Sequence, residues 1–398
     1  MAFKNRLLMP KIAAAVAKMK ILLVVDHFGS GGAQRQIVEL ASGLHARGHD
    51  VEMFVYFPEH AFFRGRLEQL HVRVHESDKR RVGSLGVLRA LVSVIRERRF
   101  DIVVSFLSGA NIYSEVAKLL TRRGKLVVSE RTSYLDDKSF FSAYLRRMLH
   151  SAADFVVANS ESQTTWLMRR WWLKGKVGCI YNGLELGRYA CETLIPRERE
   201  EIRLLAIGRI GVEKNTLNVI RALELFRRNH GYVPRFTWVG SRDMSAAGEA
   251  YGAQVHALLD SLPEVRARWE WLGLQEDIPQ LLAEHHALVH ASFYEGLPNA
   301  VCESLAAGRP VLASRVCDHP LLIAEGERGF LFDPMRPEDI NAALSRLVRL
   351  GTEEWRALSF NARQFANEYL SSERMVAAYE SLFTGMLNTD SHQSPAVN

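Results

Sequence analysis

The sequence predicts an α/β protein built from two doubly wound domains that face each other across a cleft. Three observations lead to this prediction. The chain has 398 residues, which is longer than a single hydrophobic core usually supports. Short apolar runs alternate with stretches of helical spacing, the pattern of parallel sheets covered by helices. That alternation restarts near residue 202, after a charged stretch, which indicates a second sheet.

The first half contains five clear strand candidates and two helix candidates. The strands are 20–26, 50–57, 101–106, 125–130 and 154–158, and the helices are 33–47 and 86–98. Residues 186–201, with Pro196 and a run of charged side chains, have the composition of a linker. The first domain is therefore predicted to span 19–185, followed by a linker at 186–201.

The second half repeats the pattern. Strands are expected at 203–208, 235–240, 269–273, 287–291 and 310–314, and helices at 215–229, 246–261, 276–284, 299–307, 337–350 and 353–368. The second domain is predicted to span 202–370. A final helix at 371–388 is expected to cross back to the first domain, and residues 389–398 are polar, without a period, and predicted to be disordered.

Composition and charge limit the kinds of partner that the protein is expected to bind. Hydrophobic residues make up 47% and charged residues 24%, as in an ordinary globular protein. Residues 1–195 hold 30 Lys and Arg against 18 Asp and Glu, a net of +12, whereas residues 196–398 hold 21 against 27, a net of −6. The basic first half favours an anionic partner such as a phospholipid, a polyprenyl diphosphate or a nucleic acid.

The cysteines and the apolar runs indicate the compartment. The cysteines at 179, 191, 302 and 317 form no Cys-x-x-Cys pair, which favours reduced thiols. Pro10 and Lys11 interrupt the apolar patch near the start, which argues against a signal peptide. No run approaches the roughly 18 apolar residues of a spanning helix. We therefore expect a cytoplasmic protein whose contact with the membrane is peripheral.

Two segments suit the binding of phosphate groups. Asp26–Gln36 follows the first strand and is a glycine-rich turn that opens a helix, where backbone N–H groups face outward. It matches neither Gly-x-Gly-x-x-Gly nor a Walker loop, and a tight turn without a ligand remains an alternative. In the second half, Arg209 and Lys214 follow a strand, and two cations there suit a diphosphate leaving group. The alternative is ordinary solvated surface charge.

The stretch from Phe293 to Val311, FYEGLPNAVCESLAAGRPV, is more informative. Pro298 and Asn299 are expected to begin a helix after the turn at Glu295. Glu303 then lies about one helical turn inside, so both carboxylates can accept hydrogen bonds from one polyhydroxylated ligand. Its neighbours are apolar, which disfavours a solvated helix face for Glu303.

A metal site is disfavoured. His285, His286 and His290 lie close together, but the segment has the pattern of a strand and lacks the Glu of a zincin motif. No Asp-x-Asp occurs in the chain. We therefore expect no metal and no other cofactor.

Together these motifs resemble the retaining glycosyltransferases of family 4, which have the GT-B architecture. The matching segments cover most of the chain: Gly29-Ser-Gly-Gly-Ala-Gln-Arg35, Ala158-Asn-Ser160, Tyr181-Asn-Gly183, Gly208-Arg209 with Glu213-Lys214-Asn215, Val239-Gly240, and Glu295-x7-Glu303 with Ala307-Gly-x-Pro-Val311. Their order and spacing together are specific, although each alone is weak.

The resemblance implies a role for each matching residue. Arg209 and Lys214 would bind the donor diphosphate, and Glu303 the nucleotide ribose. Glu295 would contact the transferred sugar, and the nucleotide-sugar would also be bound by Gly31, Gly32, Gly240, Gly296, Leu297 and Asn299. Many members carry a His at the end of a first-domain strand, where this chain has Val128-Ser-Glu-Arg-Thr132. In this chain, Glu130 or Arg131 is expected to occupy the place of that His or to contact the acceptor.

The expected activity is metal-independent transfer of a sugar, with retention, from a nucleotide-sugar, with UDP-sugars favoured. The expected acceptor is a lipid-linked saccharide of bacterial cell-surface glycan assembly, not a nucleic acid. Basic and aromatic residues interleave in Trp166–Lys176, with further cations in Tyr144–Met148 and Lys79–Arg81, which suits an anionic inner-membrane surface; core tryptophans with solvated cations are the alternative. Two other functions stay open, a nucleotide-sugar epimerase and a non-catalytic nucleotide-binding module.

Overall fold

The computed structural model describes residues 17–131, 147–194, 198 and 201–391, with side chains through residue 388. The chain forms two compact units. The amino-terminal unit contains the residues up to Gly183 together with those from Ser372 onward. The carboxy-terminal unit spans Leu184–Ser371. The division therefore lies just before the 186–201 segment that has a linker's composition, because residues 186–189 form a short 3-10 helix (η4) that packs on the carboxy-terminal unit.

The amino-terminal unit has a seven-stranded sheet in the order β3-β2-β1-β4-β5-β6-β7, and every pair is parallel. Its strands are β1 (Lys20–Val25), β2 (Asp50–Val55), β3 (Arg73–Glu76), β4 (Ile102–Phe106), β5 (Lys125–Glu130), β6 (Phe155–Ala158) and β7 (Val177–Cys179). The edge strands β3 and β7 were not expected, because they are short and β3 carries polar residues.

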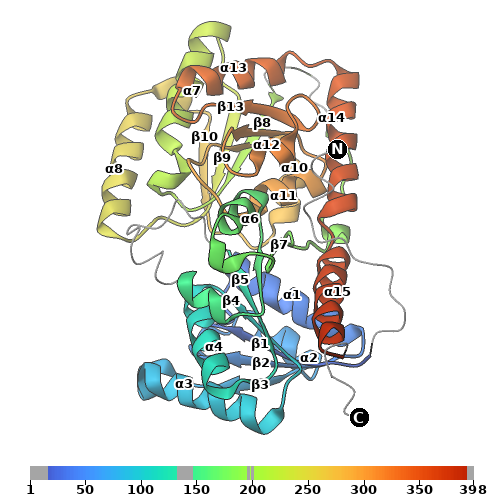
Figure 1. The fold of residues 1–398 in the computed structure, drawn as a ribbon. Helices are drawn as coiled ribbons and strands as arrows, with labels where there is room; N and C mark the ends of the chain where they lie inside the picture. Colours follow the sequence, from blue (N-terminus) through green and yellow to red (C-terminus); the bar gives the residue numbers. More distant parts are fainter. Residues whose placement is uncertain (1–16, 132–146, 195–197, 199–200, 392–398) are drawn as a thin grey trace, which may run out of the picture. The chain divides into compact units, whose positions relative to one another are not determined.

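Helices cover both faces of this sheet (Figure 1). The helices are α1 (Gly32–Ala46), α2 (Arg64–Gln69), α3 (Lys79–Arg98), α4 (Ser108–Thr121), α6 (Glu161–Met168) and α15 (Ser372–Ser391), with 3-10 turns η2 (Leu149–Ala152) and η3 (Trp171–Leu173). Ile21, Leu23 and Val25 pack with α1 and α15, whereas Leu22 and Val24 pack with α3 and α4. Such two-sided burial explains why β1 is apolar at nearly every position.

The last helix, α15, belongs to the amino-terminal unit and lies beside α1. Tyr379 and Phe383 are fully buried in the core of that unit. Glu380 accepts hydrogen bonds from Arg47 at 2.6 Å and His49 at 2.9 Å. The helix continues to Ser391, so residues 389–391 are helical where the sequence predicts disorder, and residues 392–398 lie outside the described part.

The carboxy-terminal unit has a six-stranded parallel sheet in the order β10-β9-β8-β11-β12-β13. The strands are β8 (Arg203–Ile207), β9 (Arg235–Val239), β10 (Trp269–Gly273), β11 (Ala287–His290), β12 (Val311–Ser314) and β13 (Gly329–Phe332). The helices are α7 (Thr216–His230), α8 (Ala246–Asp260), α9 (Pro263–Arg266), α10 (Ile278–Glu284), α11 (Asn299–Ala306), α12 (His319–Ile323), α13 (Pro337–Val348) and α14 (Thr352–Tyr369), with η6 at Val212–Lys214.

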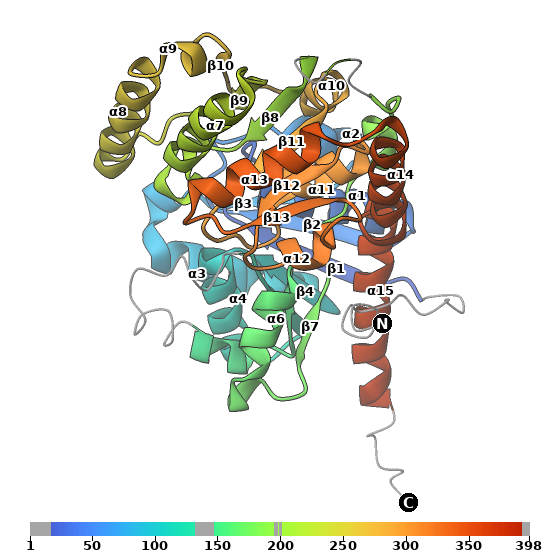
Figure 2. The same ribbon diagram turned by 90° about the horizontal axis from the view of Figure 1, so that it is seen from above.

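One face of this second sheet is covered by α7, α8 and α13, of which α7 and α13 lie side by side (Figure 2). The central neighbours β8 and β11 are the two strands from which the chain runs outward in opposite directions. A doubly wound sheet binds its ligands beyond the carboxyl ends of such a strand pair. The topology therefore directs attention to the segments that follow Ile207 and His290.

Candidate active site

The segments that follow β8, β11 and β12 bring a group of polar side chains together. Lys214 ends η6, His290 ends β11, Glu295 lies in the loop before α11, and His319 begins α12. The Lys214 Nζ atom lies 2.5 Å from Glu295 Oε1, and the His290 Nε2 atom lies 3.0 Å from the same oxygen. The rings of His290 and His319 meet edge to face, with centroids 5.3 Å apart.

Backbone contacts fix the loop that carries Glu295. The Phe293 N–H donates to the Glu213 carbonyl oxygen at 2.9 Å, which ties this loop to η6. The Glu295 N–H points at the Cys317 sulfur at 3.4 Å. The aliphatic part of the Lys214 side chain lies beside Gly208, which fixes its position. The ion pair therefore joins two segments that are 81 residues apart in sequence.

The electrostatics give each group a definite charge. Burial opposes ionisation of Glu295, but the charge of Lys214 and the hydrogen bond from His290 outweigh it and hold the pKa of Glu295 well below its usual range. Burial lowers the pKa of His290, and it lowers the pKa of His319 to about 3. At neutral pH Glu295 is therefore ionised, and the imidazoles of His290 and His319 are neutral.

Arg209 has different partners from Lys214. Its guanidinium is half exposed and contacts Glu213 Oε1 at 2.9 Å and Asp243 Oδ2 at 3.7 Å. The two cations that the sequence assigns to one diphosphate are thus each balanced by a carboxylate within the carboxy-terminal unit. Glu213 and Asp243 are site residues that sequence reasoning missed, although both lie within a few residues of a strand's carboxyl end.

Two close approaches shape the turns after β8 and β9. Gly240 has φ +144°, and a Cβ atom there would lie 2.2 Å from the Gly208 carbonyl oxygen. The Gly208 carbonyl also accepts a hydrogen bond from the Trp238 indole at 2.8 Å. Only glycine fits at position 240, and its absence of a side chain lets the two turns touch.

The predicted helix after Glu295 is α11, and its start differs by one residue from the expected cap. Pro298 occupies the N-cap position and Asn299 is the first helical residue. Gly296 and Leu297 lie in the preceding loop, and Leu297 is buried. Glu303 lies inside α11 and is only 4% exposed. Glu303 therefore does not lie on a solvated helix face.

The three histidines that are close in sequence have three different hydrogen-bond partners. His285 contacts Thr237, the His286 Nδ1 atom accepts a hydrogen bond from the Arg203 N–H at 3.0 Å, and His290 contacts Glu295. Within the described residues, no three His, Cys, Asp or Glu side chains gather in a way that could hold a metal ion. The sequence pattern suggests only a disfavoured metal site for His290, although its position as the last residue of a buried strand places it at the carboxyl edge of the sheet.

In the amino-terminal unit, the glycine-rich turn follows β1 and leads into α1. Gly31 is the N-cap residue of α1 and Gly32 its first residue. The Gln34 side-chain amide donates to Asp26 Oδ1 at 2.8 Å, and a Cβ atom on Gly31 would lie 2.2 Å from Gln34 Oε1. The side chains of the turn therefore stabilise its conformation. The turn lies at the carboxyl end of β1, and β1 is the neighbour of β4 in the sheet.

Glu130 and Arg131 lie at the end of β5 but have unlike surroundings. Glu130 is 1% exposed and its Oε1 atom contacts the ring of His150 at 3.2 Å, so we assign it a structural role and not direct contact with an acceptor. Arg131 stacks on Phe106, with 3.6 Å from Cζ to the ring centroid, and donates to Asn182 Oδ1 at 2.7 Å. Thr132, which ends the motif, lies outside the described residues.

Comparisons with known proteins identify the family of this chain. Residues 30–188 match the model of Glycosyltransferase Family 4, and residues 201–349 match Glycosyl transferases group 1. The chain is 25% identical over 296 residues to a Campylobacter jejuni N-acetylgalactosaminyltransferase that acts on an undecaprenol-linked saccharide, covering 72% of this chain and 77% of that protein. It is 22% identical to the lipopolysaccharide glucosyltransferase WaaG of Escherichia coli, covering 86% and 92%.

Solved structures show the same fold. The crystal structure of Anabaena Alr3699/HepE in complex with UDP-glucose has a TM-score of 0.76, with 21% identity, 93% of this chain and 100% of that chain covered. At this level of identity the likeness establishes the GT-B architecture. Together with the two family matches, which follow one another along the chain in the order of its two sheets, it shows that this protein is a GT-B enzyme belonging to the family 4 and group 1 glycosyltransferases.

Proposed function

We propose that the chain transfers a sugar from a UDP-sugar to a lipid-linked saccharide, with retention of anomeric configuration, in the assembly of a bacterial cell-surface glycan. The observation that carries this proposal is the partly buried Lys214–Glu295 pair at the carboxyl end of the strand pair β8 and β11. The UDP-glucose in the Anabaena structure and the lipid-linked acceptor in the Campylobacter protein's name support the choice of substrates.

The chemistry follows from charge. When the bond between the sugar's anomeric carbon and the diphosphate oxygen breaks, the diphosphate keeps the electron pair and becomes more negative. Lys214 and Arg209 would neutralise that charge, which lowers the barrier without a strong base. The departing diphosphate would take the acceptor hydroxyl proton as the new bond forms on the same face. Because Lys214 and Arg209 would balance the charge of the leaving group, we propose that the reaction needs no metal ion.

The carboxylates would orient the donor. Glu295 is ionised at neutral pH and can accept hydrogen bonds from hydroxyls of the transferred sugar. Glu303 would accept those of the ribose. Gly240, Gly296, Leu297 and Asn299 would contact the donor through backbone or short side chains, and Gly31 and Gly32 would contribute N–H groups at the start of α1. On the acceptor side we propose Arg131.

The membrane part of the proposal rests on the surface of the amino-terminal unit. The guanidinium groups of Arg147 and Arg170 each lie over the ring of Trp166, with the Cζ atoms 4.7 and 4.1 Å from its centroid. Trp171, by contrast, is 80% exposed, and Met168 is 54% exposed beside it in sequence. Among the helices of the described residues, none has the length and hydrophobicity of a transmembrane span. We propose that this surface lies on the cytoplasmic face of the inner membrane, with Trp171 at headgroup depth.

The test is a donor and acceptor screen on the purified protein. UDP-, GDP- and ADP-sugars are each incubated with undecaprenyl-diphosphate-linked saccharides, and released nucleotide and product are followed. We expect UDP release that depends on acceptor, and proton NMR should show the same anomeric configuration in donor and product. Inversion of configuration, or turnover with only GDP- or ADP-sugars, would contradict the proposal. Donor conversion without an acceptor would indicate an epimerase.

A further inference from the structure

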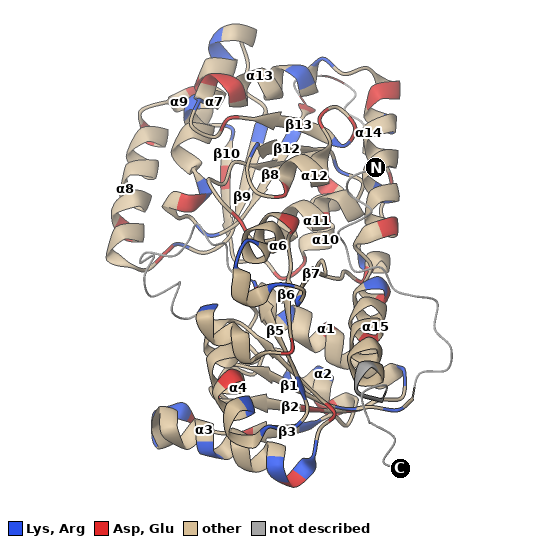
Figure 3. Ribbon diagram, in the orientation of Figure 1, with Lys and Arg blue, Asp and Glu red and all other residues tan. Residues whose placement is uncertain are grey.

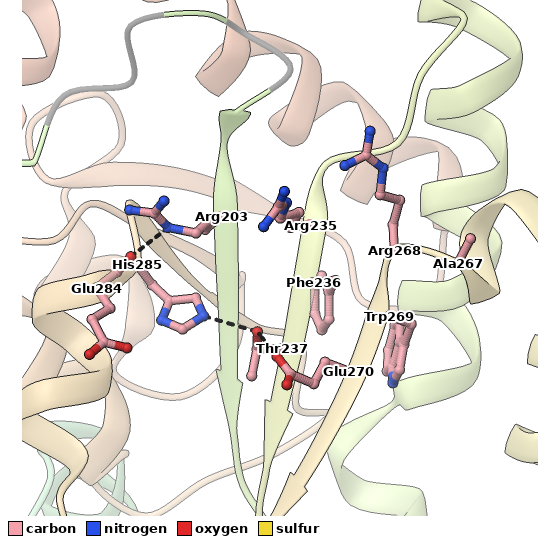
Figure 4. Close-up of a pocket in the computed structure, with 10 residues that line it drawn as sticks. All are labelled: Arg203, Arg235, Phe236, Thr237, Ala267, Arg268, Trp269, Glu270, Glu284 and His285. Atoms are coloured by element: carbon pink, nitrogen blue, oxygen red, sulfur yellow. Dashed lines mark hydrogen bonds between the residues drawn. The ribbon is translucent and has the colours of Figure 1, made fainter.

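A polar cavity lies in the carboxy-terminal unit, at the end of the sheet opposite to the Lys214–Glu295 site. Its volume is about 700 Å³, and its lining includes the first residues of β8 and β9 and the residue before β10: Arg203, Arg235 and Arg268 (Figure 4). Because all these strands are parallel, their amino ends lie at the edge away from the proposed donor site. Cavities of this size hold small organic ligands.

The strand register places the three arginines in one row. Arg203 pairs with Arg235 across β8 and β9, and the Phe236 N–H donates to the Arg268 carbonyl at 2.9 Å, which aligns Arg268 with Arg235. Neighbouring strands lie about 4.8 Å apart. In Figure 4 the Arg203 side chain is turned toward Glu284, on the side away from Arg268, whereas Arg235 and Arg268 extend from two neighbouring strand starts. Like charges directly across neighbouring strands repel each other, so this row costs stability unless an anion compensates it.

The compensation within the chain is incomplete. The Arg203 Nε–H donates to the Glu284 backbone carbonyl at 2.7 Å. Among the residues that the structure describes, neither Arg235 nor Arg268 takes part in an ion pair. Both guanidinium groups are exposed and available to a ligand. A phosphate group between two of them would receive charge-assisted hydrogen bonds from both.

The remaining lining suits hydroxyl groups. Glu270 and Glu284 also face the cavity, and the closest side-chain contact of Glu270 is Thr237 Oγ1 at 3.5 Å. The Thr237 hydroxyl is engaged by His285 Nε2 at 3.0 Å, while His285 Nδ1 contacts the Leu281 carbonyl at 2.7 Å. These carboxylates would repel a bare polyanion but accept hydrogen bonds from hydroxyls.

We propose that this cavity is an accessory binding site for a phosphorylated sugar or polyol, whose phosphate is held by Arg235 and Arg268 and whose hydroxyls face Glu270 and Glu284. The site is separate from the proposed donor site and does not depend on it. Its phosphate chemistry is shared with phospholipid headgroups, so soluble and membrane-bound sources must be distinguished.

The test measures binding in the Lys214→Ala variant, so that phosphate bound at the donor site does not obscure the result. Glucose 6-phosphate is titrated by calorimetry, with glucose and inorganic phosphate as the matched fragments. In that background, Arg235→Gln with Arg268→Gln should weaken binding of glucose 6-phosphate about tenfold or more. Arg221→Gln with Arg349→Gln removes two exposed charges from the same unit and should leave binding unchanged.

A further arm replaces the sugar phosphate with vesicles containing phosphatidylglycerol. Loss of glucose 6-phosphate binding in the Arg235/Arg268 variant supports the site with a soluble ligand. A second outcome is that the Lys214→Ala protein binds vesicles but not glucose 6-phosphate, and that the Arg235/Arg268 variant loses the vesicle binding. That outcome overturns the soluble ligand and assigns the arginines to phospholipid headgroups. Absence of any binding in the Lys214→Ala protein, or equal binding in the Arg235/Arg268 and control variants, overturns the site altogether.

Discussion

At the scale of single residues, the chemistry of the proposed donor site depends on one carboxylate oxygen shared by two partners. Glu295 Oε1 contacts both the ammonium group of Lys214 and the ring of His290. A donor diphosphate would compete with Glu295 for Lys214, and the freed carboxylate would then face the sugar. Removing either charge changes both the site and the stability of its neighbours, because a partly buried charge is left unpaired.

Replacing Lys214 should abolish most of the activity. We expect Lys214→Ala to lower kcat/KM by about 10²–10³-fold, because the charge that develops on the leaving group is no longer neutralised. Glu303→Ala should weaken donor binding to a similar degree. Steady-state kinetics and calorimetry with UDP measure the two effects.

The control for this prediction keeps the charge balance. Lys214→Met with Glu295→Gln leaves no unpaired charge, so its fold should remain intact by circular dichroism while it is still inactive. Arg221→Ala, on the exposed face of α7, should retain normal kinetics. Near-normal turnover in Lys214→Ala would remove Lys214 from the mechanism.

Gly240 should tolerate no side chain. Gly240→Ala places a Cβ atom against the backbone of Gly208 at a positive φ, and we expect a loss of at least about 2 kcal/mol in the free energy of unfolding. Gly252→Ala is the matched control, because Gly252 lies within α8 with open space around it. That change should be neutral or stabilise by up to about 1 kcal/mol. Urea unfolding of both variants measures the difference, and equal stability would contradict the close approach.

At the scale of elements, the amino-terminal unit has a buried charge network that links α4, β5 and η2. His150 lies between Glu115 and Glu130, all three side chains are at most 1% exposed, and Arg147 Nη2 lies 3.5 Å from Glu130. Burial alone would keep His150 neutral, but the two carboxylates outweigh it and raise its pKa to about 9. The network holds the carboxyl end of β5, and so the backbone from which Arg131 extends.

The stability of this unit should fall at alkaline pH. A histidine whose pKa is raised on folding stabilises fully below its unfolded pKa of about 6.5, and this contribution is lost as pH rises through about 9. The shift corresponds to about 3 kcal/mol. Urea unfolding between pH 6 and pH 10 should show a loss of this order for the wild type.

The variant His150→Gln should be less stable at neutral pH and should lose much less stability between pH 6.5 and pH 9. His256→Gln, in α8 of the other unit, controls for the removal of a histidine and should keep the wild-type profile. A wild-type profile in His150→Gln would show that His150 is not the group that titrates.

At the scale of the whole molecule, the two units share a strand order, and the proposed phosphate-binding segments follow the first strand of each sheet. Basic residues lie at both ends of α3 in the amino-terminal unit (Figure 3). Three of these, Lys79, Arg80 and Arg81, belong to the basic set that the sequence assigns to a membrane surface, whereas Tyr144–Arg146 of that set lie outside the described residues. Lys79 also lies over the rings of Tyr56, Phe57 and Tyr113, at 5.5 to 5.7 Å from their centroids, so it is partly structural.

The membrane proposal predicts vesicle binding that depends on salt and on Trp171. The wild type should sediment with anionic vesicles at low salt and less at high salt. Trp171→Ser with Met168→Ser should reduce this binding several-fold, because both side chains are exposed apolar anchors. Met244→Ser with Leu274→Ser removes two side chains of the carboxy-terminal unit that are each 77% exposed, and it should have no effect. Absence of wild-type binding at every salt concentration would contradict the proposal.

The sequence by itself determined the α/β class, the two sheets, most strand positions and the residues Lys214 and Glu295, because buried parallel strands are continuously apolar and polar residues follow them directly. It could not determine the partners of those residues. The sharing of Glu295 between Lys214 and His290, the burial of Glu130 with His150 and the row of Arg203, Arg235 and Arg268 are decided only by strand order and register. Strand order and register depend on contacts between segments far apart in the chain, and a local pattern of residues carries no information about such contacts.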